Sequence, residues 1–150
     1  MTITHKESLS CIVLSLLMPC VLFCLLAGCT TVQQTAAELQ RLQGTWEGVK
    51  EGDKITITIT GNSFRFYRDT NFWFETTITL PAGTDPQQLR ATIERCPPSQ
   101  NNSIGKVVPA IFKIEEGTLT LVAFSDHEAE PPKNFEDREA MRYELRKVQR

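Results

Sequence analysis

From residue 45 onward, hydrophobic and polar residues alternate along most of the chain. The clearest case is the segment 54–60, in which three isoleucines at alternate positions are separated by threonines. Successive side chains of a strand point to opposite faces, so this pattern predicts a strand with one buried and one wet face. Isoleucine and threonine are also β-branched, which favours strands over helices.

The same period of two recurs in seven more segments, which are bounded by residues typical of turns. Predicted strands begin at Thr45 and cover residues 54–60, 64–67, 72–80, 89–95, 111–115, 118–124 and 141–146. Most connections between them are short, as at Gly61-Asn62 and Glu116-Gly117, which predicts an eight-stranded antiparallel meander. Closing this all-β sheet into a barrel removes its exposed edges, so a barrel is favoured over an open sheet packed on a helix.

A short helix is predicted just before the first strand. Thr35 and Glu38 have the spacing of a capping box, in which each side chain accepts a hydrogen bond from the backbone of the other residue. Leu39 and Leu42 fall on one face of this helix, and Gly44 follows as a residue that ends it.

Residues 1–28 have a different pattern, which is typical of a secretory signal helix. Lys6 precedes the uncharged run 9–27, which ends in Leu25-Leu26-Ala27-Gly28-Cys29. This ending resembles the lipobox of bacterial lipoproteins, and the resemblance implies cleavage before Cys29 and acylation of that cysteine. An uncleaved spanning helix is the alternative, since 19 residues at about 1.5 Å each just cross a bilayer.

These boundaries divide the chain into a signal peptide (1–28), an acylated tether (29–34) and one barrel domain (35–150). Two or more acyl chains make membrane attachment effectively permanent, so a membrane is the first expected partner. Thr30 stands where some bacterial lipoproteins carry an Asp that retains them at the inner membrane. The expected location is therefore the cell envelope, on the outer membrane.

Charge and cysteine content exclude several functional classes. The chain has 16 Lys and Arg and 18 Asp and Glu, and removing the leader with its Lys6 and Glu7 leaves 15 and 17. No basic stripe results, so nucleic acid is not an expected partner. Cys96 is the one cysteine left after the leader and Cys29, which excludes a disulfide scaffold. A solitary thiol near a strand end is a simpler interpretation of Cys96 than a thiol activated by Arg95.

Candidate catalytic and metal-binding groups are few. Ser125-Asp126-His127 has the letters of a hydrolase triad, but consecutive residues point in alternating directions and do not converge. His127 is the only histidine of the domain, and the acids beside it, Glu128 and Glu130, lack a regular ligand spacing. The chain is therefore not expected to be an enzyme, and no catalytic residue, metal or cofactor is expected.

Gly44-Thr45-Trp46, just after the predicted helix, is similar to the Gly-x-Trp motif of lipocalins. That resemblance implies that Trp46 closes one barrel end and that an Arg of the last strand, Arg142 or Arg146, packs across its ring.

A broader resemblance covers residues 38–148. The segments 39–46, 111–121 and 132–135 resemble an uncharacterised lipocalin-like domain common in planctomycete-type bacteria. That family often has Arg-Pro-Thr ahead of the Phe, where this chain has Pro131-Pro132-Lys133. The resemblance implies a lipocalin-like barrel and no particular activity.

Aromatic residues are the main candidates for binding. Phe64, Phe66, Phe72 and Phe74 fall on one face of two adjacent predicted strands, and an eight-stranded barrel either fills with side chains or holds one small ligand. The size of the rings favours a filled interior, whereas a cup would hold a small apolar or amphipathic ligand at a mouth formed by residues 96–105 and 125–140.

The sequence leaves both interpretations open. The expected function is ligand binding, and the alternative is a structural or interaction lipoprotein that docks an envelope protein through exposed Tyr67 and Trp73. The candidate ligand-binding residues are Trp46, Phe64, Phe66, Phe72, Phe74 and Phe135.

Overall fold

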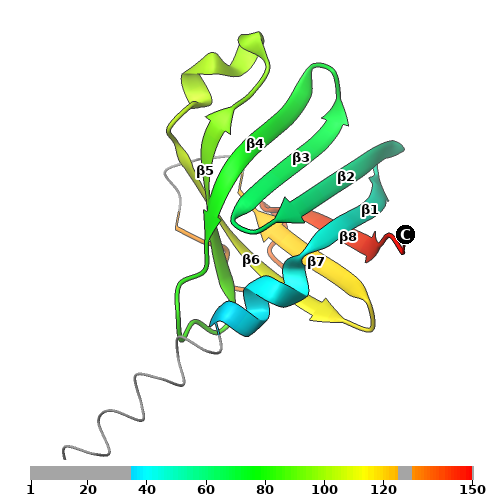
Figure 1. Cartoon of the computed structure of the whole chain (residues 1–150), viewed down its shortest axis with the longest axis vertical. Helices are drawn as coiled ribbons and strands as arrows, with labels where there is room; N and C mark the ends of the chain where they lie inside the picture. Colours follow the sequence, from blue (N-terminus) through cyan, green and yellow to red (C-terminus); the bar gives the residue numbers. More distant parts are fainter. Residues whose placement is uncertain (1–34, 125–129, 150) are drawn as a thin grey trace, which may run out of the picture.

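A computed structural model describes residues 35–124 and 130–149. They form a closed barrel of eight antiparallel strands, preceded by one short helix at residues 35–42, as predicted (Figure 1). The predicted signal peptide, the tether with Cys29 and the triad-like segment 125–127 lie outside these residues. The elements after the helix are β1 (Gly44–Lys50), β2 (Asp53–Thr60), β3 (Ser63–Asp69), β4 (Phe72–Thr79), β5 (Gln88–Arg95), the 3-10 helix η1 (Pro98–Ser103), β6 (Val107–Glu115), β7 (Thr118–Ala123) and β8 (Met141–Lys147).

Each strand pairs with the next in sequence, and β1 closes the barrel by pairing with β8. The closing register places Trp46 opposite Lys147 and Glu47 opposite Arg146. In such a meander the connections alternate between the two ends of the barrel. The helix enters at the end where β1 begins, which we call the closed end (Figure 1). The β1–β2, β3–β4, β5–β6 and β7–β8 connections lie at the other end, which we call the open end.

Two segments differ from the sequence-based prediction. Strand β6 begins at Val107, not at residue 111, and Pro109 lies within it opposite Arg90. Proline usually interrupts a paired strand, which is why the pattern indicated a later start. The predicted loop 96–105 contains η1, whose turns are closed by hydrogen bonds such as that from the Gln100 N–H to the Pro97 carbonyl at 2.8 Å.

The barrel interior is built from the inward positions that the alternation predicted. Ile55, Ile57 and Ile59 of β2 are each 2% exposed or less. Leu119 of β7 and Leu145 of β8 are equally buried and belong to the same core cluster. Burying such side chains contributes roughly 1.5–3 kcal/mol each, which makes this cluster the main source of stability.

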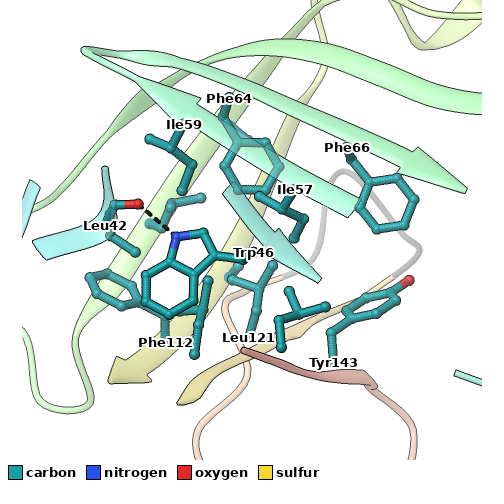
Figure 2. Close-up of a cluster of buried hydrophobic side chains, with 14 of the residues drawn as sticks. Leu42, Trp46, Ile57, Ile59, Phe64, Phe66, Phe112, Leu121 and Tyr143 are labelled. Carbon is teal, nitrogen blue, oxygen red and sulfur yellow. Dashed lines mark hydrogen bonds between the residues drawn. The ribbon is translucent and has the colours of Figure 1, made fainter. Parts of the chain in front are cut away.

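Trp46 fills the closed end and is 1% exposed (Figure 2). Its indole Nε1 donates a 2.8 Å hydrogen bond to the carbonyl of Leu42 in the last turn of the helix. The cation over its ring is Lys147, with Nζ 5.2 Å from the ring centroid, and not Arg142 or Arg146 as the lipocalin resemblance implied. The reason is strand alternation: Lys147 is paired with Trp46 and shares its face, whereas Arg142 and Arg146 point outward.

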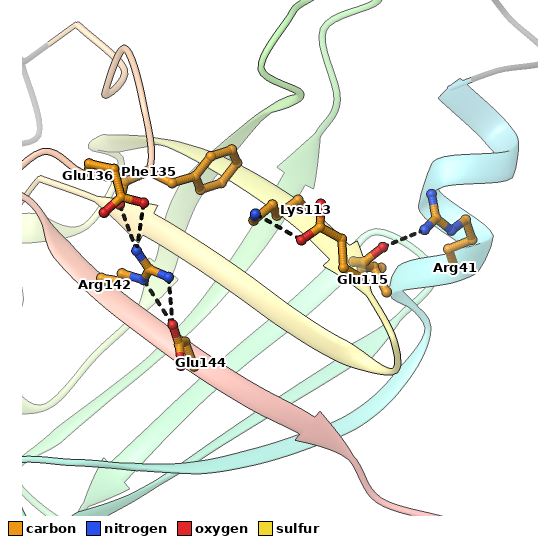
Figure 3. Close-up of polar contacts among 8 residues, drawn as sticks. Arg41, Lys113, Glu115, Phe135, Glu136, Arg142 and Glu144 are labelled. Atoms are coloured by element: carbon orange, nitrogen blue, oxygen red, sulfur yellow. Dashed lines mark hydrogen bonds and ion pairs between the residues drawn. The ribbon is translucent and has the colours of Figure 1, made fainter.

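The helix is fixed to the barrel by both apolar and polar contacts. Leu42 is buried and Leu39 packs against the core, as the helical pattern predicted. A guanidinium nitrogen of Arg41 donates to the carbonyl of Ile114 in β6 at 2.9 Å (Figure 3). Among the residues that the structure describes, no helix has the length and apolarity needed to cross a bilayer.

Candidate functional site

A cavity of about 400 Å³ lies inside the barrel toward the open end. Its walls come from β3 to β8, and Gln100 of η1 contributes from the β5–β6 connection. Gln100 Nε2 donates to the carbonyl of Asn71 at 3.4 Å, which links η1 to the β3–β4 turn at the cavity mouth. The filled interior that the size of the rings favoured is therefore wrong at this end, where the barrel is hollow.

The four phenylalanines predicted as ligand-binding residues all line this cavity. Phe66 and Phe72 meet edge to face with centroids 5.8 Å apart, and Phe72 meets Phe74 in the same way at 5.3 Å. Tyr143 of β8 extends this set, with its ring 5.5 Å from that of Phe66. Such pairs stabilise each other by roughly 0.5–1.5 kcal/mol beyond area burial. The rings thus pack against one another along one wall instead of filling the interior.

Small side chains form another wall. Ala91 of β5, Ala110 of β6 and Ala123 of β7 line the cavity, and the last two lie directly opposite each other across the β6–β7 pairing. Each is 7% exposed or less, so these are inward positions at which Leu or Ile would occupy the space. None of these alanines was among the predicted ligand-binding residues. A sequence signal for this wall was available, because each alanine occupies an inward position of a strand whose other inward residues are large.

The cavity surface is almost wholly apolar. Thr76 lines it, but its hydroxyl donates to the Phe64 carbonyl at 3.1 Å and is thereby satisfied. Burial raises the pKa of Tyr143 above its ordinary value of 10.0, so its hydroxyl is neutral at physiological pH. Among the described residues that line the cavity, Arg68 is the one that carries a formal charge. Its guanidinium lies 4.1 Å from the centroid of the Phe72 ring.

Trp46 and Phe135, also predicted as ligand-binding residues, lie away from the cavity. Trp46 is part of the closed end described above. Phe135 is on the outer surface of the barrel, with Lys113 Nζ 5.1 Å from its ring centroid (Figure 3). An Arg142 Nη donates to its backbone carbonyl at 3.1 Å.

The position of Phe135 explains an unusual feature of the outer surface. Ile111 and Val122 face each other across β6 and β7 on the outer side, yet both are 0% exposed. Neither belongs to the interior cluster. The segment 130–140, which contains the buried Pro132 and the half-buried Phe135, reaches this side of the barrel: the Phe135 ring lies beside Lys113 of β6, and its carbonyl accepts from Arg142, the residue of β8 opposite Val122 (Figure 3).

The remaining candidates have structural surroundings. Cys96 is buried just after β5, and its thiol donates to the Gln100 carbonyl at 3.1 Å. Tyr67 and Trp73, the proposed docking anchors, are paired on the outer face of β3 and β4, and Tyr67 is 43% exposed. Within residues 35–124 and 130–149, no group of three metal-ligating side chains comes together. Of the residues considered for a cation, Asp126, His127 and Glu128 lie outside those ranges and Glu130 lies within them.

Comparison with known proteins gives no match to a family model, to a curated protein or to a solved structure. The lipocalin-like family resemblance therefore stays a prediction, and the cavity itself carries the functional argument.

Proposed function

We propose that this chain is a membrane-anchored lipoprotein whose barrel binds one small apolar or amphipathic molecule. The observation that supports this is the cavity of about 400 Å³, which is within the range of roughly 300–1,000 Å³ typical of small-molecule sites. Its lining is hydrophobic and aromatic with few polar groups, which is also typical of such sites.

The cavity is suited to binding because its walls are already in place. The edge-to-face contacts hold Phe66, Phe72 and Phe74 against each other, so a ligand need not order them. An apolar ligand gains roughly 25 cal/mol for each Å² of apolar surface that it removes from water.

The anchor is the second part of the proposal and is supported by the sequence ending at Cys29. The described chain begins at residue 35, at the closed end, and six residues reach at most about 20 Å. Acylation of Cys29 would hold the closed end next to the bilayer and direct the open end away from it. We therefore place the protein in the cell envelope, on the outer membrane, with the cavity mouth facing the aqueous compartment.

Metabolic labelling with a palmitate analogue tests the anchor. The full chain should take up the label and fractionate with membranes, and Cys29→Ala should lose the label. Cys96→Ala is the matched control, because its thiol is buried in the barrel and should leave labelling unchanged. Label that survives Cys29→Ala would exclude the anchor.

A fluorescence titration tests the cavity. Every described core side chain lies between Leu39 and Leu145, so residues 29–150 with Cys29→Ser contain the whole core. We call this the domain chain. It should bind the neutral dye N-phenyl-1-naphthylamine with a saturable rise in emission.

Filling the cavity should abolish that signal. The double substitution Ala91→Leu and Ala123→Leu adds bulk to its wall, whereas Thr92→Leu places a leucine on the outer face of β5, next to Ala91. Loss of dye binding in the first variant, but not in the second, is expected. A dye signal that both variants retain, in folded protein, would exclude the cavity as the binding site.

A docking function is the second candidate, favoured by the exposure of Tyr67 beside Trp73 on the outer face. Pull-down from solubilised membranes with full-length protein, and with Tyr67→Ser, tests it. An envelope protein that is captured by the first and lost with the second would support docking.

A further inference from the structure

Arg68 is placed where a ligand headgroup would lie. On β3 it comes two residues after Phe66, at a shift of the β3–β4 register between Tyr67 and Asp69, and it lines the same cavity as Phe64 and Phe66. It sits at the open end of that row, just before the β3–β4 turn. Its side chain is 37% exposed, so the guanidinium borders both the apolar cavity and water.

Contacts made by Nε fix the orientation of this guanidinium. Nε donates to the Asp69 carboxylate at 3.0 Å and lies 3.7 Å from that of Asp53. The backbone N–H of Asn71 and the side chain of Arg68 both hold the pKa of Asp69 below its ordinary value, so the carboxylate stays charged. Phe72 supports the flat face of the group at 4.1 Å. Nη1 and Nη2 carry four further N–H donors in the planar fork that suits a carboxylate or phosphate.

A second cation stands at the same rim. Lys50 Nζ lies 5.5 Å from the centroid of Tyr143, whose ring lines the cavity. Burial raises the pKa of Tyr143, and the positive charge of Arg68 acts in the opposite direction by a smaller amount. Arg68 is therefore also within electrostatic range of that tyrosine. Two cations thus flank one side of the mouth, above an interior that offers almost wholly apolar surface to the rest of a ligand.

We propose that the cavity takes a single-chain amphiphile with an anionic headgroup, whose chain fills the aromatic and alanine-lined interior and whose head is held by the Nη atoms of Arg68. This rests on the proposed function and narrows it to one ligand class. Exposed acids also border the mouth: Glu51 beside Lys50, and Asp53 and Asp69 beside Arg68. Asp53 and Asp69 meet Arg68 at Nε, on the side of the guanidinium away from the Nη fork that we assign to the headgroup.

Three ten-carbon ligands that differ in headgroup provide the test: decanoate, 1-decanol and decyltrimethylammonium. Each is used below its micelle concentration to displace N-phenyl-1-naphthylamine from the domain chain. Decanoate should bind roughly tenfold more tightly than the other two, as charge-assisted hydrogen bonds to a guanidinium would give. The ratio of decanoate to decanol affinity is compared within each variant, so that a change in overall binding does not disturb it.

Arg68→Gln should reduce that ratio to about one, because the amide keeps polarity but loses the charge and the fork. Arg65→Gln is the matched control: it removes the same charge from the same strand, but on the outer face, where Arg65 pairs with Glu75. Arg68→Lys should retain part of the preference for decanoate. It replaces Arg68→Gln in the comparison if the Gln variant does not fold. Three results would overturn the headgroup assignment while leaving the cavity proposal intact. They are equal affinities of decanoate and decanol in the unsubstituted chain, tighter binding of the ammonium ligand than of decanoate, and a decanoate-to-decanol ratio that Arg68→Gln leaves unchanged. Absence of any dye binding would instead overturn the proposed function.

Discussion

Gly48 packs so closely against β8 that a Cβ atom at this position would lie 2.3 Å from the backbone oxygen of Glu144. It would also lie 2.9 Å from a methyl carbon of Leu145. Gly48 is an inward position of β1, the strand that closes the barrel on β8. The absence of a side chain is therefore what allows β1 and β8 to approach at this point.

We expect Gly48→Ala to lower the free energy of unfolding by about 2–3 kcal/mol, the upper part of the range for overpacking. The clash is with backbone, which cannot move without disturbing the β1–β8 pairing. Chemical denaturation of the domain chain measures the change. Gly52→Ala is the control, because Gly52 has φ +91° but nothing within 4 Å of its added Cβ. It should cost about 1 kcal/mol, from backbone conformation alone. A Gly48→Ala cost no larger than that of Gly52→Ala would contradict the close-approach argument.

Trp46→Phe should destabilise the barrel without changing the cavity. Without the indole N–H, the Leu42 carbonyl loses its 2.8 Å hydrogen bond in a buried site, which costs roughly 1–3 kcal/mol, and the smaller ring leaves a void. Thermal unfolding followed by circular dichroism measures the loss. Dye affinity should stay the same, since Trp46 does not line the cavity. A large fall in dye affinity in a folded Trp46→Phe variant would return Trp46 to the binding site.

Phe135→Ala should likewise destabilise the barrel without changing the cavity, because Phe135 lies on the outer surface. Ile111 and Val122 would become exposed, and we expect a loss of about 1–2 kcal/mol, less than the roughly 3–5 kcal/mol for a fully buried Phe. Phe135→Leu keeps an apolar cover and should lose less than half as much. Urea denaturation gives both values. Equal stability of the Ala variant and the unsubstituted chain would show that Phe135 is not the cover.

Stability should fall at alkaline pH because of Tyr143. Burial raises its pKa in the folded state, whereas the unfolded chain has the ordinary value of about 10. A pKa raised on folding means that the contribution is fully present below the unfolded pKa and is lost as pH rises through the folded one. The free energy of unfolding, measured by urea at several pH values, should therefore decline above about pH 10. Tyr143→Phe should reduce that slope, and an unchanged slope would show that another group is responsible.

Much of the fold could be predicted because one barrel face is buried and the other is wet. The alternation of Ile55, Ile57 and Ile59 with threonine fixes which side chains enter the core, and short turns fix the order of the strands. Leu39 and Leu42 likewise predicted the buried face of the helix. The start of β6 was predicted too late, because the local propensity of Pro109 for a turn was outweighed by its pairing with β5, whereas the pairing with β7 begins at Ala110.

The candidate site was predictable only in part. The period of two placed Phe64, Phe66, Phe72 and Phe74 on one inward face, and they do line the cavity. Trp46 and Phe135 could not be assigned in this way. An aromatic residue at the closed end or on the outer surface looks the same in the sequence as an aromatic residue that lines the cavity.

The sequence by itself determined which residues face inward and that the strands follow one another around a sheet, because both depend on local periodicity and short connections. Tertiary structure alone decided that Lys147, not an arginine, covers Trp46, and that Phe135 lies on the outer side of the barrel beside Lys113 and Arg142. It also decided that the interior is hollow. That outcome depends on how aromatic rings on β3 and β4 pack relative to alanines on β5 to β7, and such distances are set by barrel closure and not by any pattern along the chain.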